Sequence, residues 1–249
     1  MHSLTAGVYQ ETMKIVLKKK TLFFLVATLL LPAVAAILLA RFQSGIGIGA
    51  IASQDFPIIM LGLFTSIFFP LFAFMGAADL FSGEIGDRTM KLTLTRPITR
   101  FKVFASKQAA LALSLAAFLA AGFAASLLSA LWLDGMGGFG SLLDVCMAYA
   151  AAFLPLVTLS IAAVCLAQLF SSSSGALTAS LLVYLVLKVA AFFVPQIGKY
   201  SPTAYTDWHM LWIGSTLSGS HIGGVFMFLA ACSILFFTAG YYFFDKKEL

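Results

Sequence analysis

Six long apolar runs constrain the fold of this sequence more than any other feature. They lie at about 21–40, 58–78, 108–133, 145–170, 175–194 and 223–244. A helix of about 20 apolar residues crosses the hydrocarbon of a bilayer, and each run is close to that length or longer. The runs are continuous, whereas the strands of a membrane barrel alternate in hydropathy. The sequence therefore predicts an all-α, polytopic membrane protein with six transmembrane helices in a single domain, residues 1–249.

The composition favours the same class of protein. Charged residues make up 10% of the chain and hydrophobic residues 61%, whereas a soluble domain carries about 25% charged residues. The apolar stretch after the N-terminal lysines is too long for a signal peptide, and it has no small-residue cleavage site before Arg41. We therefore expect it to stay in the protein as the first span.

The positions of Lys and Arg predict the orientation. If the N-terminus is cytoplasmic, twelve of the fifteen basic residues fall in cytoplasmic segments, while Arg41 and Lys199 lie outside and Lys188 lies within the fifth run. Cytoplasmic loops carry such an excess, and six spans return the C-terminus to the same side. The net charge of +5 is explained by attraction to anionic lipid headgroups, so the expected partner is the bilayer and not nucleic acid.

Two shorter segments accompany the spans. Residues 1–20 mix apolar and charged side chains and predict a cytoplasmic helix lying in the membrane interface. The loop before the sixth run carries Tyr200, Tyr205, Trp208 and Trp212. Aromatic residues of this kind gather at the lipid headgroups, and we expect these four side chains to do so.

A charged segment at 79–107, called the elbow below, separates the second run from the third and holds nine of the 25 charged residues. Glu84 and Arg88 are four residues apart, a spacing that allows an ion pair on a helix. Pro97 then breaks the helix, and Thr99 is placed to cap a new helix that begins at Arg100. The pattern predicts a helix, a sharp turn and a second helix. The alternative is an ordinary cytoplasmic loop with positive-inside charges.

The stretch SGEIGDRTMKLTLTRPITRFKVFASK within the elbow resembles the signature of the type-2 ABC exporter permease family. The residues that match are Glu84, Thr89, Leu92, Leu94, Pro97, Ile98, Thr99, Arg100 and Lys107. The sequence departs from the pattern at Arg88, where the family usually has glycine, and at Ala105 and Ser106, where glycine often precedes the lysine. The six runs, the N-terminal helix and the placement of both termini extend the resemblance over nearly the whole chain.

The resemblance implies that the elbow is a coupling helix inserted into an ATPase subunit. The coupling residues it implies are Glu84, Arg88, Thr89, Leu92, Leu94, Pro97, Thr99 and Arg100. It further implies the permease subunit of an exporter for a hydrophobic or amphipathic cargo in the bacterial inner (plasma) membrane. Such a permease works with a second copy, in a homodimer or with a close paralogue, and with two ATPase subunits. The chain lacks the G-x-x-x-x-G-K-[ST] phosphate loop, so we expect no enzymatic activity and no cofactor here, with ATP and Mg in the partner.

A secondary transporter or channel, not coupled to ATP, is the alternative function. Such proteins place carboxylates near the middle of the membrane, whereas Asp79, Asp134 and Asp144 lie at the edges of runs. A Glu or His inside a run, which intramembrane catalysis would need, is missing from the sequence. His209 and His221 lack partners at metal-ligand spacing, so no metal site is expected.

Lys188 is the one basic residue inside a run, and it has two interpretations. Its ammonium group can snorkel to the nearby headgroups, since it lies about two helical turns from the end of the run. Alternatively, it contacts substrate or a second permease, because charges inside a membrane are usually functional. Lys188 is therefore the candidate substrate-binding residue.

Overall fold

The computed structural model describes residues 2–46, 56–90, 98–134, 142–194, 196, 198, 200–212 and 219–247. These residues form helices joined by short turns, and no strand occurs among them. Six of the helices are long and apolar enough to cross a membrane: Lys19–Arg41, Phe56–Gly86, Arg100–Leu133, Leu142–Ala167, Ser173–Phe193 and Ile222–Lys246. The prediction of an all-α membrane protein with six transmembrane helices is confirmed.

The second span is a composite of five helical pieces. It runs through α3 (Phe56–Leu63), the π-helix η1 (Phe64–Phe68), α4 (Phe69–Ala77), the π-helix η2 (Ala78–Gly83) and α5 (Glu84–Gly86). The remaining elements are α1 (His2–Val16), α2 (Lys19–Ile46), α7 (Arg100–Asp134), α8 (Leu142–Ala167), α9 (Ser173–Phe193), the 3-10 helix η4 (Pro202–Trp212) and α11 (Gly219–Lys246). π-Helical segments are rare and are frequent at functional sites.

Helices extend into the elbow from both sides. The second span continues to Gly86 instead of ending near residue 78, and α7 begins at Arg100, where the sequence predicts a new helix. Charged residues are tolerated in these extensions because they find partners there, as described below. Between these helices the described residues of the elbow are 87–90, 98 and 99, and residues 91–97 lie outside the described residues.

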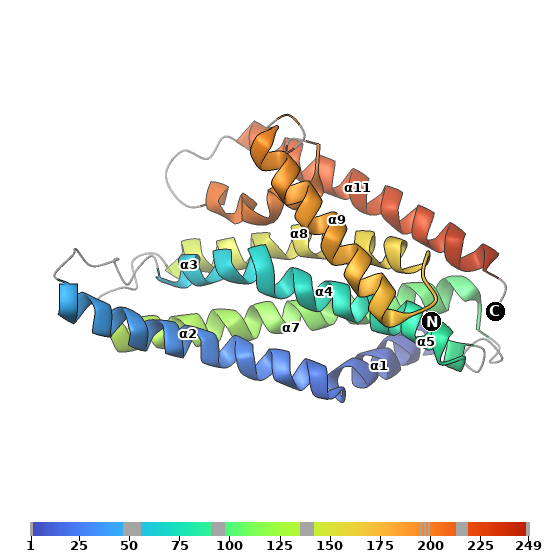
Figure 1. Cartoon of the computed structure of the whole chain (residues 1–249), viewed down its shortest axis with the longest axis horizontal. Coiled ribbons are helices and arrows are strands. Elements are labelled where there is room, and N and C mark those ends of the chain that lie inside the picture. The colour runs from blue at the N-terminus through green and yellow to red at the C-terminus, as the bar shows by residue number, and fades with distance from the viewer. Residues whose placement is uncertain are drawn as a thin grey trace.

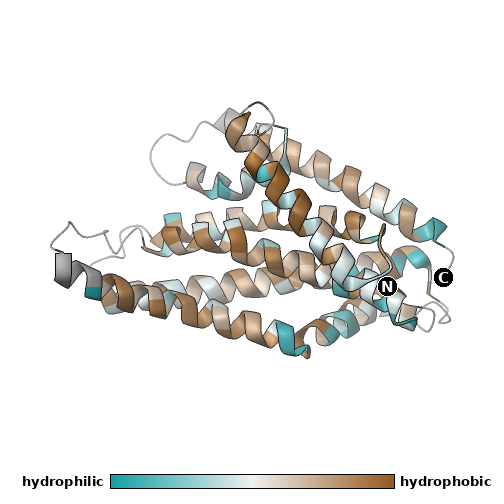
Figure 2. Ribbon diagram, viewed as in Figure 1, coloured by the Kyte–Doolittle hydropathy of each residue, from teal (hydrophilic) through white to brown (hydrophobic). Residues whose placement is uncertain are grey.

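Both termini and α5 lie at one end of the bundle (Figure 1). An even number of spans places them there. The second span, α7 and α8 form the centre, where α7 packs on α1 and α2, and α8 packs on α4, η4 and α11. Hydrophilic residues gather at the end that holds the termini, while apolar residues cover the middle of the helices (Figure 2).

The core is rich in phenylalanine. Phe72 of α4 lies 4.4 Å from Phe118 of α7, measured between ring centroids, and 5.6 Å from Phe24 of α2. Nearer the termini, Phe81 and Phe104 lie 5.4 Å apart, and both rings are buried. These aromatic contacts fix the second span against α2 and α7, because interlocking rings allow few alternative arrangements.

The loop before the last span differs from the prediction. Its residues 202–212 form η4, a helix that packs against α8. Trp208 is buried, and its indole N–H donates to the Ala151 carbonyl at 2.7 Å. The expectation of a headgroup position is therefore wrong for Trp208, whose ring packs with Val225 and Leu229. Tyr200, in contrast, is exposed.

A candidate coupling site at the end that holds the termini

The elbow turn begins where α5 ends. The amide of Asp87 donates to the Gly83 carbonyl at 2.9 Å, and the amide of Arg88 donates to the Ile85 carbonyl at 3.1 Å. Arg88 then adopts a positive φ of 57°, a conformation that favours glycine. The family signature has glycine at this position. The turn is therefore formed with Arg88 in the glycine conformation, at a cost of about 1–2 kcal/mol.

Glu84 does not pair with Arg88, because the helix ends before Arg88. One oxygen of Glu84 lies 2.8 Å from the Lys107 ammonium, close enough for an ion pair but without the geometry of a hydrogen bond, and the other lies 3.3 Å from the ammonium of Lys14. The sequence interpretation of a Glu84–Arg88 pair is corrected in this respect. Glu84 connects the elbow to α7 and to α1 instead.

Lys107 is the centre of this arrangement. Its side chain is 0% exposed, and its ammonium donates to Glu11 Oε2 of α1 at 3.0 Å. Glu11 also accepts a hydrogen bond from Lys14 at 2.8 Å. We call these four residues, Glu11, Lys14, Glu84 and Lys107, the ion cluster. A buried ammonium needs such partners, because an unpaired charge in the interior is strongly destabilising.

Helix α1 brings Glu11 to Lys107 by packing closely on α7. Glu11 and Ile15 are buried on one face of α1. On the same face, a Cβ added to Gly7 would lie 3.3 Å from the side chain of Ser106. The opposite face carries Tyr9 and Met13, both exposed. The N-terminal helix thus has one buried face, and that face is directed to α7.

The ion cluster shifts the titration of its α1 residues. Burial alone would raise the pKa of Glu11, but Lys107 and Lys14 outweigh it and hold this pKa below the ordinary value of 4.5. Burial would lower the pKa of Lys14, but hydrogen bonding and attraction to Glu11 and Glu84 raise it above 10.5. Both shifts favour the charged forms, so the charges stabilise one another.

Asp79 forms a second set of contacts one turn before the ion cluster. Its carboxylate lies 3.5 Å from the Lys18 ammonium and 3.4 Å from that of Lys20, at the start of α2. It also accepts a hydrogen bond of 2.6 Å from the hydroxyl of Ser173, the first residue of α9. Asp79 therefore connects the second span to both the first and the fifth.

The elbow also fits closely against the turn between α8 and α9. The hydroxyl of Ser82 donates to the Ala167 carbonyl at 2.7 Å. A Cβ added to Gly86 would lie 2.8 Å from the Ser171 carbonyl oxygen. Only glycine fits at that distance, because a backbone carbonyl cannot rotate away as the end of a flexible side chain could. The elbow therefore contacts the end of α8 through the Ser82 hydroxyl and the turn that follows α8 directly through its own backbone at Gly86.

Arg100 contacts the end of the last span. Its guanidinium donates to the Asp245 carbonyl at 2.5 Å and to the Lys247 carbonyl at 3.4 Å. Lys247 in turn donates to the Gln168 carbonyl at 2.7 Å, at the end of α8. Cations are favourable at helix C-termini, where carbonyls lack partners within the helix. Arg100 thus connects the start of α7 to α11.

The other predicted coupling residues lie along the same turn. The hydroxyl of Thr89 donates to the Glu84 carbonyl at 3.3 Å, and the carbonyl of Thr99 accepts the amide of Val103 in the first turn of α7. Leu92, Leu94 and Pro97 lie outside the described residues. The structure thus brings Glu84, Thr89 and Arg100 to one end of the bundle, and whether they contact an ATPase stays a prediction.

Lys188 has partners within the protein. Its ammonium donates to the Thr206 hydroxyl of η4 at 2.8 Å and lies 3.8 Å from the Asp207 carboxylate. It also lies 5.9 Å from the ring centre of Tyr184. Snorkelling to headgroups stays a prediction, because these contacts leave the side chain 30% exposed. Contact with substrate stays a prediction.

Sequence reasoning did not single out Glu11, Lys18 or Ser173 as partners of the elbow. A signal for Glu11 was available, because it is the only acidic residue among the first 54. A single carboxylate on an amphipathic helix next to three lysines is a candidate for a buried ion pair. Among the described residues, no group of three or more His, Cys, Asp or Glu could hold a metal ion.

The fold and the site together define a multi-pass helical membrane protein whose charged elbow is ion-paired to neighbouring helices. The family model described as ABC-2 family transporter protein matches residues 8–249. The chain therefore belongs to this family, whose members are the membrane subunits of ABC transporters and not the ATPases. No curated protein matches the sequence significantly.

Proposed function

We propose that this chain is the permease subunit of an ABC exporter, driven by a separate ATPase subunit that docks on residues 79–107. The observation that carries the proposal is the ion cluster, which joins the elbow to α1 and α7 through the buried Lys107. Family membership supports an ABC ATPase as the partner. ATP and Mg belong to that partner subunit.

The contacts of the elbow explain how a push on it could reach the spans. Separating Glu84 from Lys107 would leave a fully buried ammonium with fewer partners, and losing a partner of a buried charge costs about 1–3 kcal/mol. Moving the elbow, α1 and α7 together avoids that cost. Asp79 and Arg100 extend the same connection to α9 and α11. A push on the elbow would thus move the elbow and the helix ends around it together, as one body.

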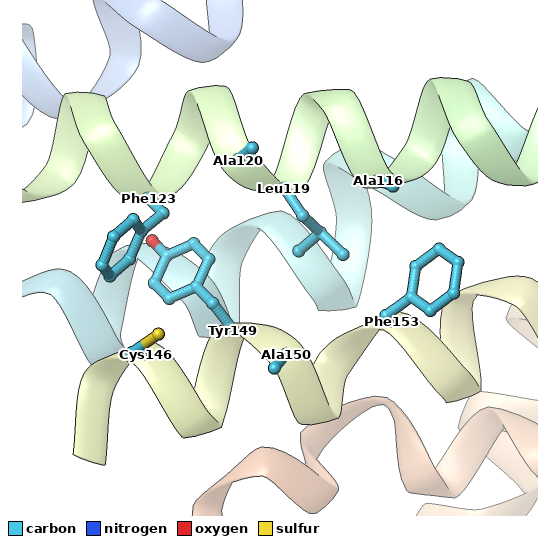
Figure 3. Close-up of a pocket in the computed structure, with 8 residues that line it drawn as sticks. All are labelled: Ala116, Leu119, Ala120, Phe123, Cys146, Tyr149, Ala150 and Phe153. Carbon is cyan, nitrogen blue, oxygen red and sulfur yellow. The ribbon is translucent and has the colours of Figure 1, made fainter. Parts of the chain in front are cut away.

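A cavity between α7 and α8 supports a hydrophobic or amphipathic cargo. Its volume is about 360 Å³. Ala116, Leu119 and Ala120 line it from α7, while Phe153 and Cys146 lie on the α8 side (Figure 3).

Tyr149 and Phe123 close one end of this cavity (Figure 3). The Tyr149 hydroxyl donates to the Pro57 carbonyl at 3.2 Å and is 2.9 Å from the Ser126 hydroxyl. Because these bonds occupy the hydroxyl, Tyr149 presents its ring to the cavity. Such a surface offers little to a charged cargo and suits an apolar one.

The proposal includes a second permease copy, as a homodimer or with a close paralogue, in the bacterial inner membrane with both termini in the cytoplasm. The excess of Lys and Arg in the segments on the side of the termini supports this orientation. Export, in place of import, follows from the resemblance of the elbow to the exporter signature.

The experiment tests docking at Arg88, which is exposed on the elbow turn. The permease is co-expressed with the ATPase encoded next to it, and copurification and ATPase rate are measured. Arg88→Gly removes the charge and relieves the positive φ, whose cost of about 1–2 kcal/mol offsets the chain entropy of glycine, so it should weaken the complex without destabilising the chain. Arg88→Lys should retain the complex, and Lys19→Asn is a control that removes an exposed positive charge elsewhere. If Arg88→Gly and Glu84→Ala both leave copurification and ATPase stimulation unchanged, the ATPase does not dock on the elbow.

A further inference from the structure

A second cavity, separate from the one between α7 and α8, lies where α4, α8, α9 and α11 meet beneath η4. Its volume is about 170 Å³. The residues that line it are almost all apolar: Phe74, Leu159, Ala162, Ala163, Cys165, Leu166, Ser180, Val183, Tyr184, Leu187, Pro202, Thr203 and Phe236. A protein cavity of about 150 Å³ with such a lining holds one benzene-sized group. This cavity therefore has room for a short segment of hydrocarbon chain.

The cavity borders the bilayer along α9. Ser180, Val183, Tyr184 and Leu187 line it at a spacing of three and four residues, which places them along one face of the helix. Val183 is at the same time 41% exposed on the outer surface of the bundle. In a membrane that surface faces lipid, so a lipid chain can reach the cavity without crossing water.

A cation lies in line with the cavity wall. Lys188 follows Ser180 and Tyr184 at intervals of four residues, so its side chain leaves α9 one turn beyond the last of these lining residues. It lies five residues before Phe193, the end of α9, which is about 8 Å along the helix. Its side chain is 30% exposed. The ammonium is thus placed near the depth of the headgroups, while the cavity extends from it toward the middle of the membrane.

The ammonium of Lys188 retains hydrogen-bonding capacity. It has three N–H donors, and among the described residues one hydrogen bond is formed, to Thr206. Asp207, at 3.8 Å, is beyond hydrogen-bond distance and also accepts a hydrogen bond from Ser66 at 3.0 Å. A phosphate oxygen can therefore join Lys188 without displacing its present hydrogen bond.

We propose that this cavity binds one acyl chain of an anionic phospholipid whose phosphate contacts Lys188. A cation at headgroup depth attracts the phosphate of an anionic lipid by charge. Bound there, the lipid would fill the space between α9 and α11 and hold η4 above it. The inference needs only the membrane location of the chain and does not depend on how the ATPase docks.

The test uses the purified permease, without ATPase, in phosphatidylcholine vesicles that contain a trace of phosphatidylglycerol with a photoreactive acyl chain. Adducts are mapped to peptides by mass spectrometry. We expect adducts on the lining segments around Cys165 and Val183. Unlabelled phosphatidylglycerol should compete for them severalfold better than added phosphatidylcholine. These measurements use the wild-type chain and do not depend on the folding of a variant.

Two variants sharpen the test. Ala162→Phe fills the cavity and should abolish its adducts, while Ala120→Phe, the same change in the cavity between α7 and α8, should leave them. Lys188→Met should keep the adducts but lose the preference for phosphatidylglycerol. Adducts confined to outward residues such as Leu182 and Ile234, or equal competition by the two lipids, would overturn the proposal. So would Ala162→Phe abolishing transport while lipid labelling of the cavity is unchanged, because the cavity would then belong to cargo.

Discussion

The ammonium of Lys107 lies 3.0 Å from the carboxylate of Glu11, although 96 residues separate them in the chain. The contact joins the third span to the N-terminal helix. A carboxylate oxygen of Glu84, in the elbow, lies 2.8 Å from the same ammonium. Lys107, two turns into α7, is thus the point where three segments are held together. Its burial makes the contact costly to break.

We predict that Glu84 and Lys107 are energetically coupled. Glu84→Gln should lower the free energy of unfolding by about 1–3 kcal/mol, because a partner of a buried charge is lost. Lys107→Met should also destabilise the protein, since it leaves Lys14 as the remaining cation of the ion cluster for two carboxylates. The double variant should be more stable than the sum of the two effects by more than about 1 kcal/mol. Denaturant unfolding in detergent measures this, with exposed Asp87→Asn as the neutral control. Additive effects would show that the two residues act independently.

We predict that Gly86→Ala uncouples the elbow from the turn between α8 and α9. Alanine is normally the better helix former by about 1 kcal/mol, but here its Cβ would meet the Ser171 carbonyl oxygen at 2.8 Å. The variant should be less stable and should transport less. Gly62→Ala is the matched control in the same span, because a Cβ there meets nothing within 4 Å. Equal stability of the two variants would contradict the close fit of Gly86.

We predict that the stabilisation from Glu11 depends on pH. Its pKa is lowered in the folded protein, so its contribution is fully present above pH 4.5 and is lost as the pH falls through the lower folded value. For Lys14, whose pKa is raised, the contribution is present below pH 10.5 and lost above it. The difference in unfolding temperature between wild type and Glu11→Gln should be constant near neutral pH and vanish at strongly acidic pH. A difference that persists at strongly acidic pH would point to packing and not to charge.

We predict that cysteines placed at 137 and 218 are labelled from outside the cell, and that a cysteine at 93 is labelled only after permeabilisation. The excess of Lys and Arg on the side of the termini is the reason. The three native cysteines, Cys146, Cys165 and Cys232, are first replaced by serine or alanine. Labelling of position 93 in intact cells would reverse the orientation. These three positions lie outside the described residues.

The spans and the start of α7 could be predicted because their causes are local. A run of apolar residues about as long as the bilayer is thick has few alternatives to a transmembrane helix, since every backbone group must be satisfied within the segment. The start of α7 at Arg100 was predicted from the residues immediately before it, and it is confirmed. The elbow could be placed in the sequence for the same reason.

The partners of the elbow were decided by tertiary structure. Arg88 was the nearer cation to Glu84 in sequence, but Arg88 turns into a positive φ, while the packing of α1 on α7 buries Lys107 beside Glu84. A buried charge gains far more from a partner than an exposed one, so burial selects the pair. Tertiary packing also decided where η4 lies, and therefore that Lys188 contacts Thr206 and Asp207. Local hydropathy set which segments cross the membrane, and the packing of those segments set which charges meet, because burial depends on residues distant in the chain.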